Sequence, residues 1–137
     1  MLKLSELKTN DLVLVNEDGT IREGRVVEVN HTDNKVLVDN GVQDFWYTKD
    51  ALTGILINDT ILMNKLGFEK QAEDGFIKYK KDAFRLVVKD NYDFSHIDMW
   101  YREDRRSFNT HLATHTLQNL FYDMTKIHLE PVGMEHE

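Results

Sequence analysis

The sequence contains no cysteine, a single proline and only three serines among its 137 residues. Without cysteine there can be no disulfide, no thiolate metal ligand and no cysteine nucleophile, a composition typical of intracellular proteins. None of the serines lies in the GxSxG pattern of hydrolases. The seven glycines are dispersed, so no glycine-rich phosphate loop is present. These absences disfavour the common enzyme classes, and we expect a non-enzymatic protein without a cofactor.

Long apolar runs are also missing. The first residues, MLKLSELKTND, contain no apolar stretch of secretory length, and no segment approaches the roughly 18 apolar residues that span a bilayer. The net charge of −7, from 17 basic and 24 acidic residues, disfavours broad attraction to nucleic acid or anionic lipid. A hydrophobic content of 41% is nevertheless enough for a packed core. We expect a soluble, cytoplasmic protein that does not bind membranes.

The N-terminal part of the chain consists of short apolar runs separated by turn sequences. The runs expected to form strands are residues 12–15, 25–29, 35–38, 45–48 and 54–57. The separators EDG, HTDN and DNG favour the tight conformations that close hairpins. Short strands at this spacing predict an antiparallel β-barrel over residues 1–57, because closing the sheet removes exposed strand edges.

Within this part, the segment EGRVVEVNHTDNKVLVDNG resembles the second and third strands of SH3-like barrels of the KOW and Tudor kind. The resemblance is carried by Gly24, Val26, Val27, Val29, Val36 and Val38. It implies binding of peptides, nucleic acid or modified side chains through aromatic residues beside the third and fourth strands. Phe45, Trp46 and Tyr47 occupy about that place, and we predict that they contact a protein partner. The alternative is that two of them pack inward, since strand side chains alternate between faces.

A second module, residues 58–137, follows without a proline-rich or serine-rich spacer, so the two modules are expected to pack rigidly together. Asn58 and Asp59 can cap a short helix that ends at Gly67. Alternating residues 75–81 and 83–90 predict a hairpin with one solvated face. A third strand is expected within residues 92–102, followed by a charged turn over residues 103–107 and a fourth strand ending at Phe108.

The clearest helical period lies in residues 110–126, with Asn109 or Thr110 as the expected N-cap. On this pattern Gln118 faces outward, whereas Asn119 or His115 should be buried and bonded to backbone. The predicted fold class is α+β: an N-terminal SH3-like antiparallel barrel packed on a module of helix, three- or four-stranded antiparallel sheet and helix. The acidic tail from Glu130 onward is expected to fray.

The second module also resembles small uncharacterised proteins encoded by phages and mobile elements of Bacteroidota. The resemblance is carried by the LGF turn at residues 66–68 and by the helix HTLQNLFYDMT at residues 115–125, which is similar to a pattern HxLQNLYxxLT. Lys126 departs from it, because those proteins carry glycine there. The resemblance implies a phage or mobile-element origin and no particular activity.

His111 and His115 are four residues apart, which on a helix would place two imidazoles on one face, as in zinc-binding helices. The HExxH pattern is not met, because Leu112 follows His111. Further ligands would have to come from His96, His128, Asp93 or Asp98. We therefore predict no metal site: His115 should hydrogen-bond to the sheet and His111 should be solvated in the first turn of the helix. A metal-dependent enzyme is the second alternative to a binding protein.

Basic residues form the remaining candidate site. The candidate nucleic-acid-binding residues are Lys78, Lys80, Lys81, Arg85, Arg105 and Arg106. Tyr79, Trp100 and Tyr101 are interleaved with them, a composition used by single-stranded nucleic-acid sites. Acidic residues are mixed in, so a solvated and charge-balanced sheet face is the default expectation. The sequence thus favours a protein-binding function, keeps a single-stranded nucleic-acid-binding accessory protein as the first alternative, and gives no oligomeric state.

Overall fold

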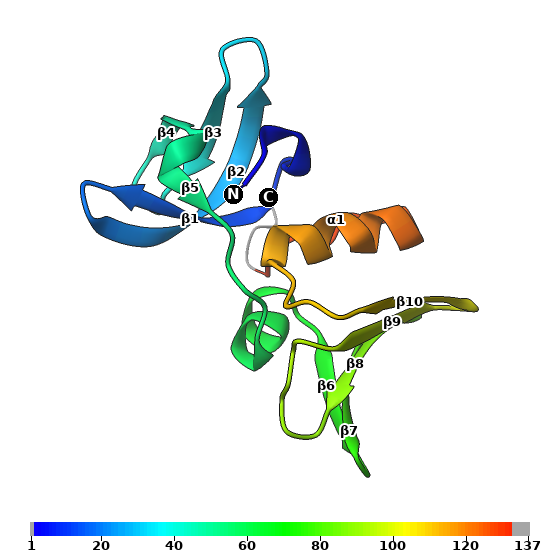
Figure 1. Ribbon diagram of the computed structural model, residues 1–137. Helices are drawn as coiled ribbons and strands as arrows, with labels where there is room; N and C mark the ends of the chain where they lie inside the picture. The colour runs from blue at the N-terminus through cyan, green and yellow to red at the C-terminus, as the bar shows by residue number, and fades with distance from the viewer. Residues whose placement is uncertain (1, 133–137) are drawn as a thin grey trace. The chain divides into compact units, whose positions relative to one another are not determined.

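The computed structural model describes residues 2–132, and the chain divides into two compact units (Figure 1). Unit 1 comprises Met1–Ile55 and Ala113–Asn119, and unit 2 comprises Leu56–Leu112 and Leu120–Glu137. The expected α+β character is confirmed, since the described residues form two antiparallel sheets and one α-helix. The division into modules at residue 57 stays a prediction.

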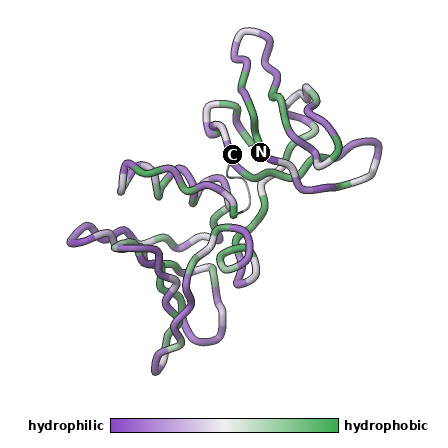
Figure 2. Tube along the Cα trace, turned by 180° about the vertical axis from the view of Figure 1, so that it is seen from behind, coloured by the Kyte–Doolittle hydropathy of each residue, from purple (hydrophilic) through white to green (hydrophobic). Residues whose placement is uncertain are grey.

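Unit 1 contains a five-stranded antiparallel sheet with the order β4-β3-β2-β1-β5. Its strands are β1 (Leu12–Glu17), β2 (Thr20–Asn30), β3 (Lys35–Asp39), β4 (Asp44–Thr48) and β5 (Leu52–Thr53). Two 3-10 helices, η1 (Leu4–Glu6) and η2 (Lys49–Ala51), precede β1 and β5. Hydrophilic residues occupy the tip of the β2–β3 hairpin (Figure 2), as expected for a solvated turn.

The first four predicted strands are confirmed, but the fifth was placed at residues 54–57 and lies earlier, at β5. The carbonyl of Ile55 instead accepts hydrogen bonds from the backbone N and the Oγ1 of Thr114, at 2.6 and 2.7 Å. A side chain on Gly54 would place its Cβ 2.9 Å from the Cβ of Ala113. Residues after β5 therefore pair with the start of the helix rather than with a strand.

The core of unit 1 is formed by alternating strand residues. Its fully buried members include Val13, Val15, Val26, Val36 and Val38. Gly24 in β2 lies between neighbouring strands, where an added Cβ would come within 2.5 Å of Val38 Cγ1 and 3.1 Å of Val15 Cγ2. The missing side chain thus allows β1 and β3 to approach β2 closely. Closure of the sheet into a barrel stays a prediction.

Unit 2 contains an antiparallel meander with the strand order β10-β9-β8-β7-β6 (Figure 1). Its strands are β6 (Glu69–Glu73), β7 (Phe76–Lys81), β8 (Phe84–Lys89), β9 (Ile97–Tyr101) and β10 (Asp104–Phe108). The prediction of three or four strands was wrong, because the polar strand β6, EKQAE, has no apolar alternation to reveal it. The prediction of a charged turn over residues 103–107 was also wrong. The turn lies earlier, where Arg102 adopts a φ of +57°, and the chain pairs with β9 from Asp104 onward.

The short helix before β6 is a π-helix, η3 (Ile61–Lys65). Asn58 caps it as predicted, because its Oδ1 accepts a hydrogen bond from the backbone N of Ile61 at 2.8 Å. Gly67 follows with a φ of +74°, the left-handed conformation that favours glycine after a helix. Phe68 then packs into the core of unit 2.

Helix α1 (Thr114–Thr125) is shorter than the predicted 110–126, and the expected N-caps Asn109 and Thr110 lie outside it. Residue 112 is held in an extended segment, because its carbonyl accepts a hydrogen bond from Ile57 N at 3.0 Å. Leu117 is buried within unit 1, whereas Phe121 packs in unit 2 against Phe84, with ring centroids 4.8 Å apart. Lys126 ends the helix with a φ of +63°, a position where glycine is favoured.

The segment from residue 127 to residue 132 contacts other parts of unit 2. Leu129 and Pro131 are buried, and Val132 N donates a hydrogen bond to Lys65 O at 2.7 Å. The rest of the tail that was expected to fray, residues 133–137, lies outside the described residues.

Candidate functional site

The sheet of unit 2 has one buried face and one exposed face, because its strand side chains alternate. The buried face carries Ile77, Tyr79, Phe84, Leu86, Val88, Ile97 and Met99. The opposite face of β7 to β10, called here the outer face, carries Lys78, Lys80, Arg85, Val87, Asp98, Trp100, Arg105 and Ser107. None of these outer-face side chains is fully buried.

A row of cationic side chains crosses the outer face around Trp100. The strand register places Lys80 opposite Arg85, and Trp100 opposite both Arg85 and Arg105. The two guanidinium carbons lie 5.0 and 5.3 Å from the centroid of the Trp100 ring, within cation–π distance. Three neighbouring strands therefore present planar cationic groups and an indole together.

Asp98 is the acidic member of the outer face. Its Oδ1 lies 3.4 Å from an Arg105 nitrogen and accepts a hydrogen bond from Ser107 Oγ at 2.6 Å. Within residues 2–132, no carboxylate lies at ion-pair distance from Lys78, Lys80 or Arg85. The outer face therefore carries more positive than negative charge, and most of its cations are available to a ligand.

Lys81 and Arg106, which were predicted with this group, lie on the other side of the sheet. The register places Lys81 opposite Phe84 and Arg106 opposite Met99. The Nζ of Lys81 donates to the carbonyl of residue 66, at 3.4 Å, and Arg106 pairs with Asp104 and Asp123 at 3.3 and 3.1 Å. The structure thus brings together four of the six predicted cations.

Trp100 was not among the predicted site residues, although the sequence held a signal for it. Met99 and Trp100 are adjacent in one strand, so they must face opposite sides of the sheet. Since one side is the core, the more amphipathic indole was the better candidate for the exposed side.

The three aromatic residues of β4 do not form one platform. Tyr47 is 6% exposed and receives a hydrogen bond from Asn40 Nδ2 at 2.9 Å, whereas Phe45 and Trp46 are 45% and 40% exposed. Phe45 lies on the same face as Tyr47, with ring centroids 5.0 Å apart, and Trp46 lies opposite Leu37 on the other face. Two aromatic rings are therefore accessible along a terminal strand, one on each face.

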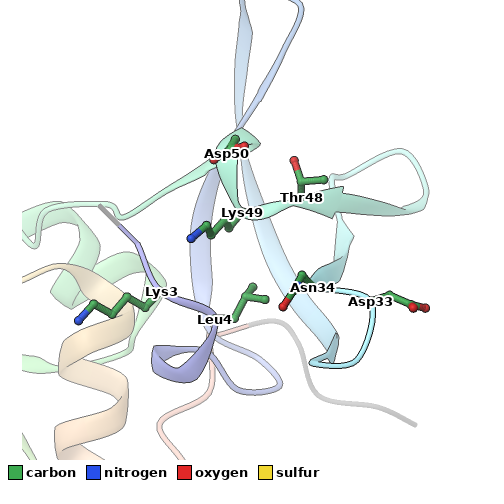
Figure 3. Close-up of a pocket in the computed structure, with 7 residues that line it drawn as sticks. All are labelled: Lys3, Leu4, Asp33, Asn34, Thr48, Lys49 and Asp50. Atoms are coloured by element: carbon green, nitrogen blue, oxygen red, sulfur yellow. The ribbon is translucent and has the colours of Figure 1, made fainter.

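A pocket of about 410 Å³ lies beside the end of β4 (Figure 3). Its lining residues are Lys3, Leu4, Asp33, Asn34, Thr48, Lys49 and Asp50. Two lysines and two aspartates nearly cancel in charge around the apolar Leu4. This lining favours neither an anionic nor a cationic ligand, and the aromatic side chains of β4 do not contribute to it.

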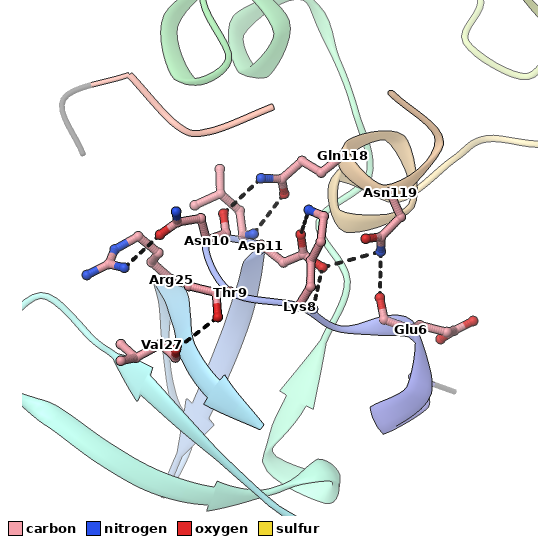
Figure 4. A network of polar contacts seen from close by, with 10 residues as sticks. Glu6, Lys8, Thr9, Asn10, Asp11, Arg25, Val27, Gln118 and Asn119 are labelled. Atoms are coloured by element: carbon pink, nitrogen blue, oxygen red, sulfur yellow. Dashed lines mark hydrogen bonds and ion pairs between the residues drawn. The ribbon is translucent and has the colours of Figure 1, made fainter. Parts of the chain in front are cut away.

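Gln118 is the centre of a polar network in unit 1 (Figure 4). Its side chain is fully buried, so the prediction that it faces outward was wrong. Its Oε1 accepts a hydrogen bond from Leu12 N at 2.9 Å, and its Nε2 donates to Asn10 O at 2.8 Å. The amide thus supplies the donor and acceptor that a neighbouring strand would otherwise provide at the start of β1.

Asn119 and Asp11 extend this network. Asn119 Nδ2 donates to the carbonyl of Glu6 at 2.6 Å, so the predicted backbone bond is present, but the residue is half-buried rather than buried as predicted. Asp11 is fully buried and forms an ion pair with Lys8 Nζ at 2.6 Å. Burial raises the pKa of Asp11, although the charge and hydrogen bonds of Lys8 act in the opposite direction. These groups bind one another, so the network stabilises unit 1 and leaves little capacity for a ligand.

The two histidines of the predicted helix have separate roles. His111 precedes α1, and its Nε2 lies 2.6 Å from Ile57 O. His115 is 4% exposed, and its Nδ1 has no hydrogen-bond partner among the described residues. Burial lowers the pKa of His115, outweighing the opposite effect of Asp11 and Glu6. Across residues 2–132, no three His, Asp or Glu side chains are grouped as metal ligands.

Comparisons of the chain with protein-family models, with curated proteins and with solved structures found no match. The resemblances to SH3-like barrels and to phage proteins therefore stay predictions. Within the described part of the chain, no helix combines the length and the apolar composition needed to cross a membrane.

Replacing Gln118 with methionine should lower the free energy of unfolding by about 2 to 4 kcal/mol. Methionine is similar in shape but removes this partner from the buried amide of Leu12 and from the partly buried carbonyl of Asn10, at about 1 to 2 kcal/mol each. Urea denaturation followed by circular dichroism measures the change. Gln43→Met, at an exposed turn position, is the matched control and should stay within about 0.5 kcal/mol of wild type. Equal losses in the two variants would contradict the role of Gln118.

The stability of the protein should fall as the pH drops below about 6.5, the ordinary pKa of a histidine. The pKa of His115 is lower in the folded state than in the unfolded state, so below that pH the unfolded chain binds more protons. One such proton contributes at most about 1.4 kcal/mol per pH unit. Denaturation at pH 7.5 and pH 5.5 measures the loss.

His115→Asn should reduce this pH-dependent loss, whereas His31→Asn, at an exposed turn, should retain it. The raised pKa of Asp11 acts with the opposite sign, since protonating a buried carboxyl favours the folded state. The comparison between variants removes that contribution because both retain Asp11. A loss that His115→Asn leaves unchanged would show that other groups cause it.

Proposed function

We propose that this protein binds single-stranded nucleic acid on the outer face of the unit 2 sheet. The observation that supports this most is the placement of Lys78, Lys80, Arg85 and Arg105 beside Trp100 on one exposed face. Cations attract backbone phosphates, and aromatic rings or guanidinium groups stack on unpaired bases. The protein acts without catalysis, as a binding protein of phage or mobile-element origin.

The shape of the face suits a single strand better than a duplex. Neighbouring strands of a sheet are about 4.8 Å apart, so Lys80, Arg85 and Arg105 form a shallow row across three strands and the intervening Trp100. Duplex DNA is read by an element that enters a groove, whereas splayed bases of a single strand can lie on an open sheet. A sheet face with stacking and cationic groups therefore fits exposed bases and their phosphates.

The net charge of the whole protein, −7, opposes this function less than it first suggests. Exposed charges farther apart than about 8 Å are largely screened at physiological ionic strength. Within that range, the ligand meets the four cations of the outer face, Asp98, which is paired with Arg105, and Glu69 of β6, which lies opposite Lys80. Local charge therefore decides the interaction, and the distant acidic residues slow association rather than prevent it.

A second candidate function is binding of a protein partner through β4. It is supported by the exposure of Phe45 and Trp46 on a terminal strand of the unit 1 sheet. We propose that unit 1 is an SH3-like barrel, consistent with its five antiparallel strands and the 3-10 helix η2 before β5. An extended peptide could add to the free side of β4, with an aromatic ring available on each face.

The nucleic-acid function predicts salt-dependent binding of labelled single-stranded oligonucleotides, measured by fluorescence anisotropy. Each neutralised phosphate of a single strand contributes a slope of about 0.7 in log K against log salt. The double variant Lys78→Gln/Lys80→Gln should therefore bind more weakly, with a slope reduced by about 1.4.

The matched control is Lys35→Gln/Lys49→Gln, which removes the same charge from exposed positions of unit 1. It should leave the affinity and the salt slope close to those of wild type. Absence of binding at low salt, or equal weakening in both double variants, would refute a specific role of the outer face.

The second candidate predicts that a partner captured by the wild-type protein from host lysate is lost with Trp46→Ala. Removing an aromatic anchor at the centre of an interface typically weakens binding by about 2 kcal/mol or more. Val42→Ala is the control, because this neighbouring apolar side chain is 79% exposed. A partner retained by Trp46→Ala, or lost equally with Val42→Ala, would exclude β4 as the specific contact.

A further inference from the structure

Strand β4 is an open edge of the unit 1 sheet. It pairs with β3 on one side, and no described strand lies on its other side. Natural edge strands are usually protected against further pairing by charged residues, proline or a bulge. The two edges of the unit 2 sheet have such charges, since β6 reads EKQAE and β10 reads DRRSF. Strand β4 reads DFWYT and pairs with β3 without a register shift, so it lacks this protection apart from Asp44.

The strand register shows which backbone groups of β4 point away from β3. Asn40 N donates to Gln43 O at 3.1 Å, so these two residues form a hydrogen-bonded pair. Hydrogen-bonded and non-hydrogen-bonded pairs alternate along an antiparallel ladder. The backbone N–H groups of residues 44, 46 and 48 therefore face the free side, together with the carbonyls of residues 44 and 46. Within residues 2–132, no strand pairs with them.

The side chains of β4 are compatible with antiparallel pairing to the same strand of a second copy. In a two-fold arrangement centred on Trp46, this residue lies opposite its counterpart, Phe45 lies opposite Tyr47, and Asp44 lies opposite Thr48. Aromatic residues then face aromatic residues, and Asp44 faces a neutral hydroxyl. The two Trp46 residues exchange backbone hydrogen bonds, and Thr48 N donates to Asp44 O. Centring the pair on Asp44 instead would place two carboxylates opposite each other, which is unfavourable.

We infer that β4 pairs with β4 of a second copy of this chain and joins the two unit 1 sheets into one. The contact is small, because a standard interface has about 20 to 30 residues on each side. The dimer is therefore weak, and its population depends on protein concentration. This inference rests on the proposed binding of a protein partner through β4 and names that partner. It does not depend on the nucleic-acid function.

Sedimentation velocity of the full-length protein over a range of concentrations tests the inference. The apparent mass should rise from that of a monomer to that of a dimer, with a dissociation constant on the order of micromolar. Hydrogen exchange measured by NMR tests the register. The amide protons of Trp46 and Thr48 should exchange several-fold more slowly at high concentration, whereas that of Asp18, in the exposed β1–β2 turn, should not change.

Two variants interrupt the contact at different atoms. Trp46→Lys places like charges opposite each other across the two-fold axis. Thr48→Pro removes an N–H that faces the free side, and the φ of Thr48, −80°, is one that proline can adopt. Each variant should weaken the dimer about tenfold or more, with circular dichroism confirming that the fold is retained. Ile21→Lys, at an exposed position of β2, is the control and should dimerise like wild type.

A monomer at every concentration up to about 1 mM would overturn the inference. Capture of a host protein by that monomer, lost with Trp46→Ala, would then leave the β4 function itself standing. A dimer retained by both Trp46→Lys and Thr48→Pro would also overturn the inference, because the contact would lie elsewhere on the molecule.

Discussion

The two-residue period of the unit 2 strands is the constraint on which the candidate site depends. Burial of Tyr79, Leu86 and Met99 on one face forces their neighbours Lys78, Arg85 and Trp100 onto the other. A shift of one residue in any pairing would bury these cations and expose the core. The cost of burying unpaired charges is several kcal/mol per group, so the core also fixes the composition of the outer face. The candidate binding surface is thus a consequence of packing.

The alternation of strand side chains also explains which parts of the structure could be predicted from the sequence. Strands rich in valine between turn residues were identified, because alternation and turn chemistry are local. Strand β6 was missed, and the start of β10 was assigned to a turn although its end at Phe108 was predicted, since EKQAE and DRRSF are polar and edge strands are held mainly by backbone pairing with a neighbour. Trp100 could have been assigned to the exposed face from its adjacency to Met99, but its pairing with Arg85 and Arg105 required the strand register.

The errors around helix α1 have a different cause, because they depend on contacts distant in sequence. Gln118 is polar and adjacent to the apolar stripe, so helical periodicity placed it outside. Its partners at residues 10 and 12 lie more than a hundred positions away. A buried amide that satisfies two backbone groups is favourable only when both partners are present. The late helix start follows in the same way from the bond between Ile57 and residue 112.

The cationic side chains of unit 2 differ in whether they form ion pairs. On the core side of the sheet, Arg106 is neutralised by Asp104 and Asp123, and near the edge Lys70 lies 3.2 Å from Asp59. The lysines of the outer face have no such partners within the described residues. An exposed ion pair contributes only about 0 to 1 kcal/mol to folding, so leaving these lysines unpaired costs little stability. Binding a phosphate to them releases counterions without breaking an existing pair. An acidic protein can therefore keep a cationic binding face, because on that face Lys78, Lys80, Arg85 and Arg105 outnumber Asp98 and the neighbouring Glu69 of β6.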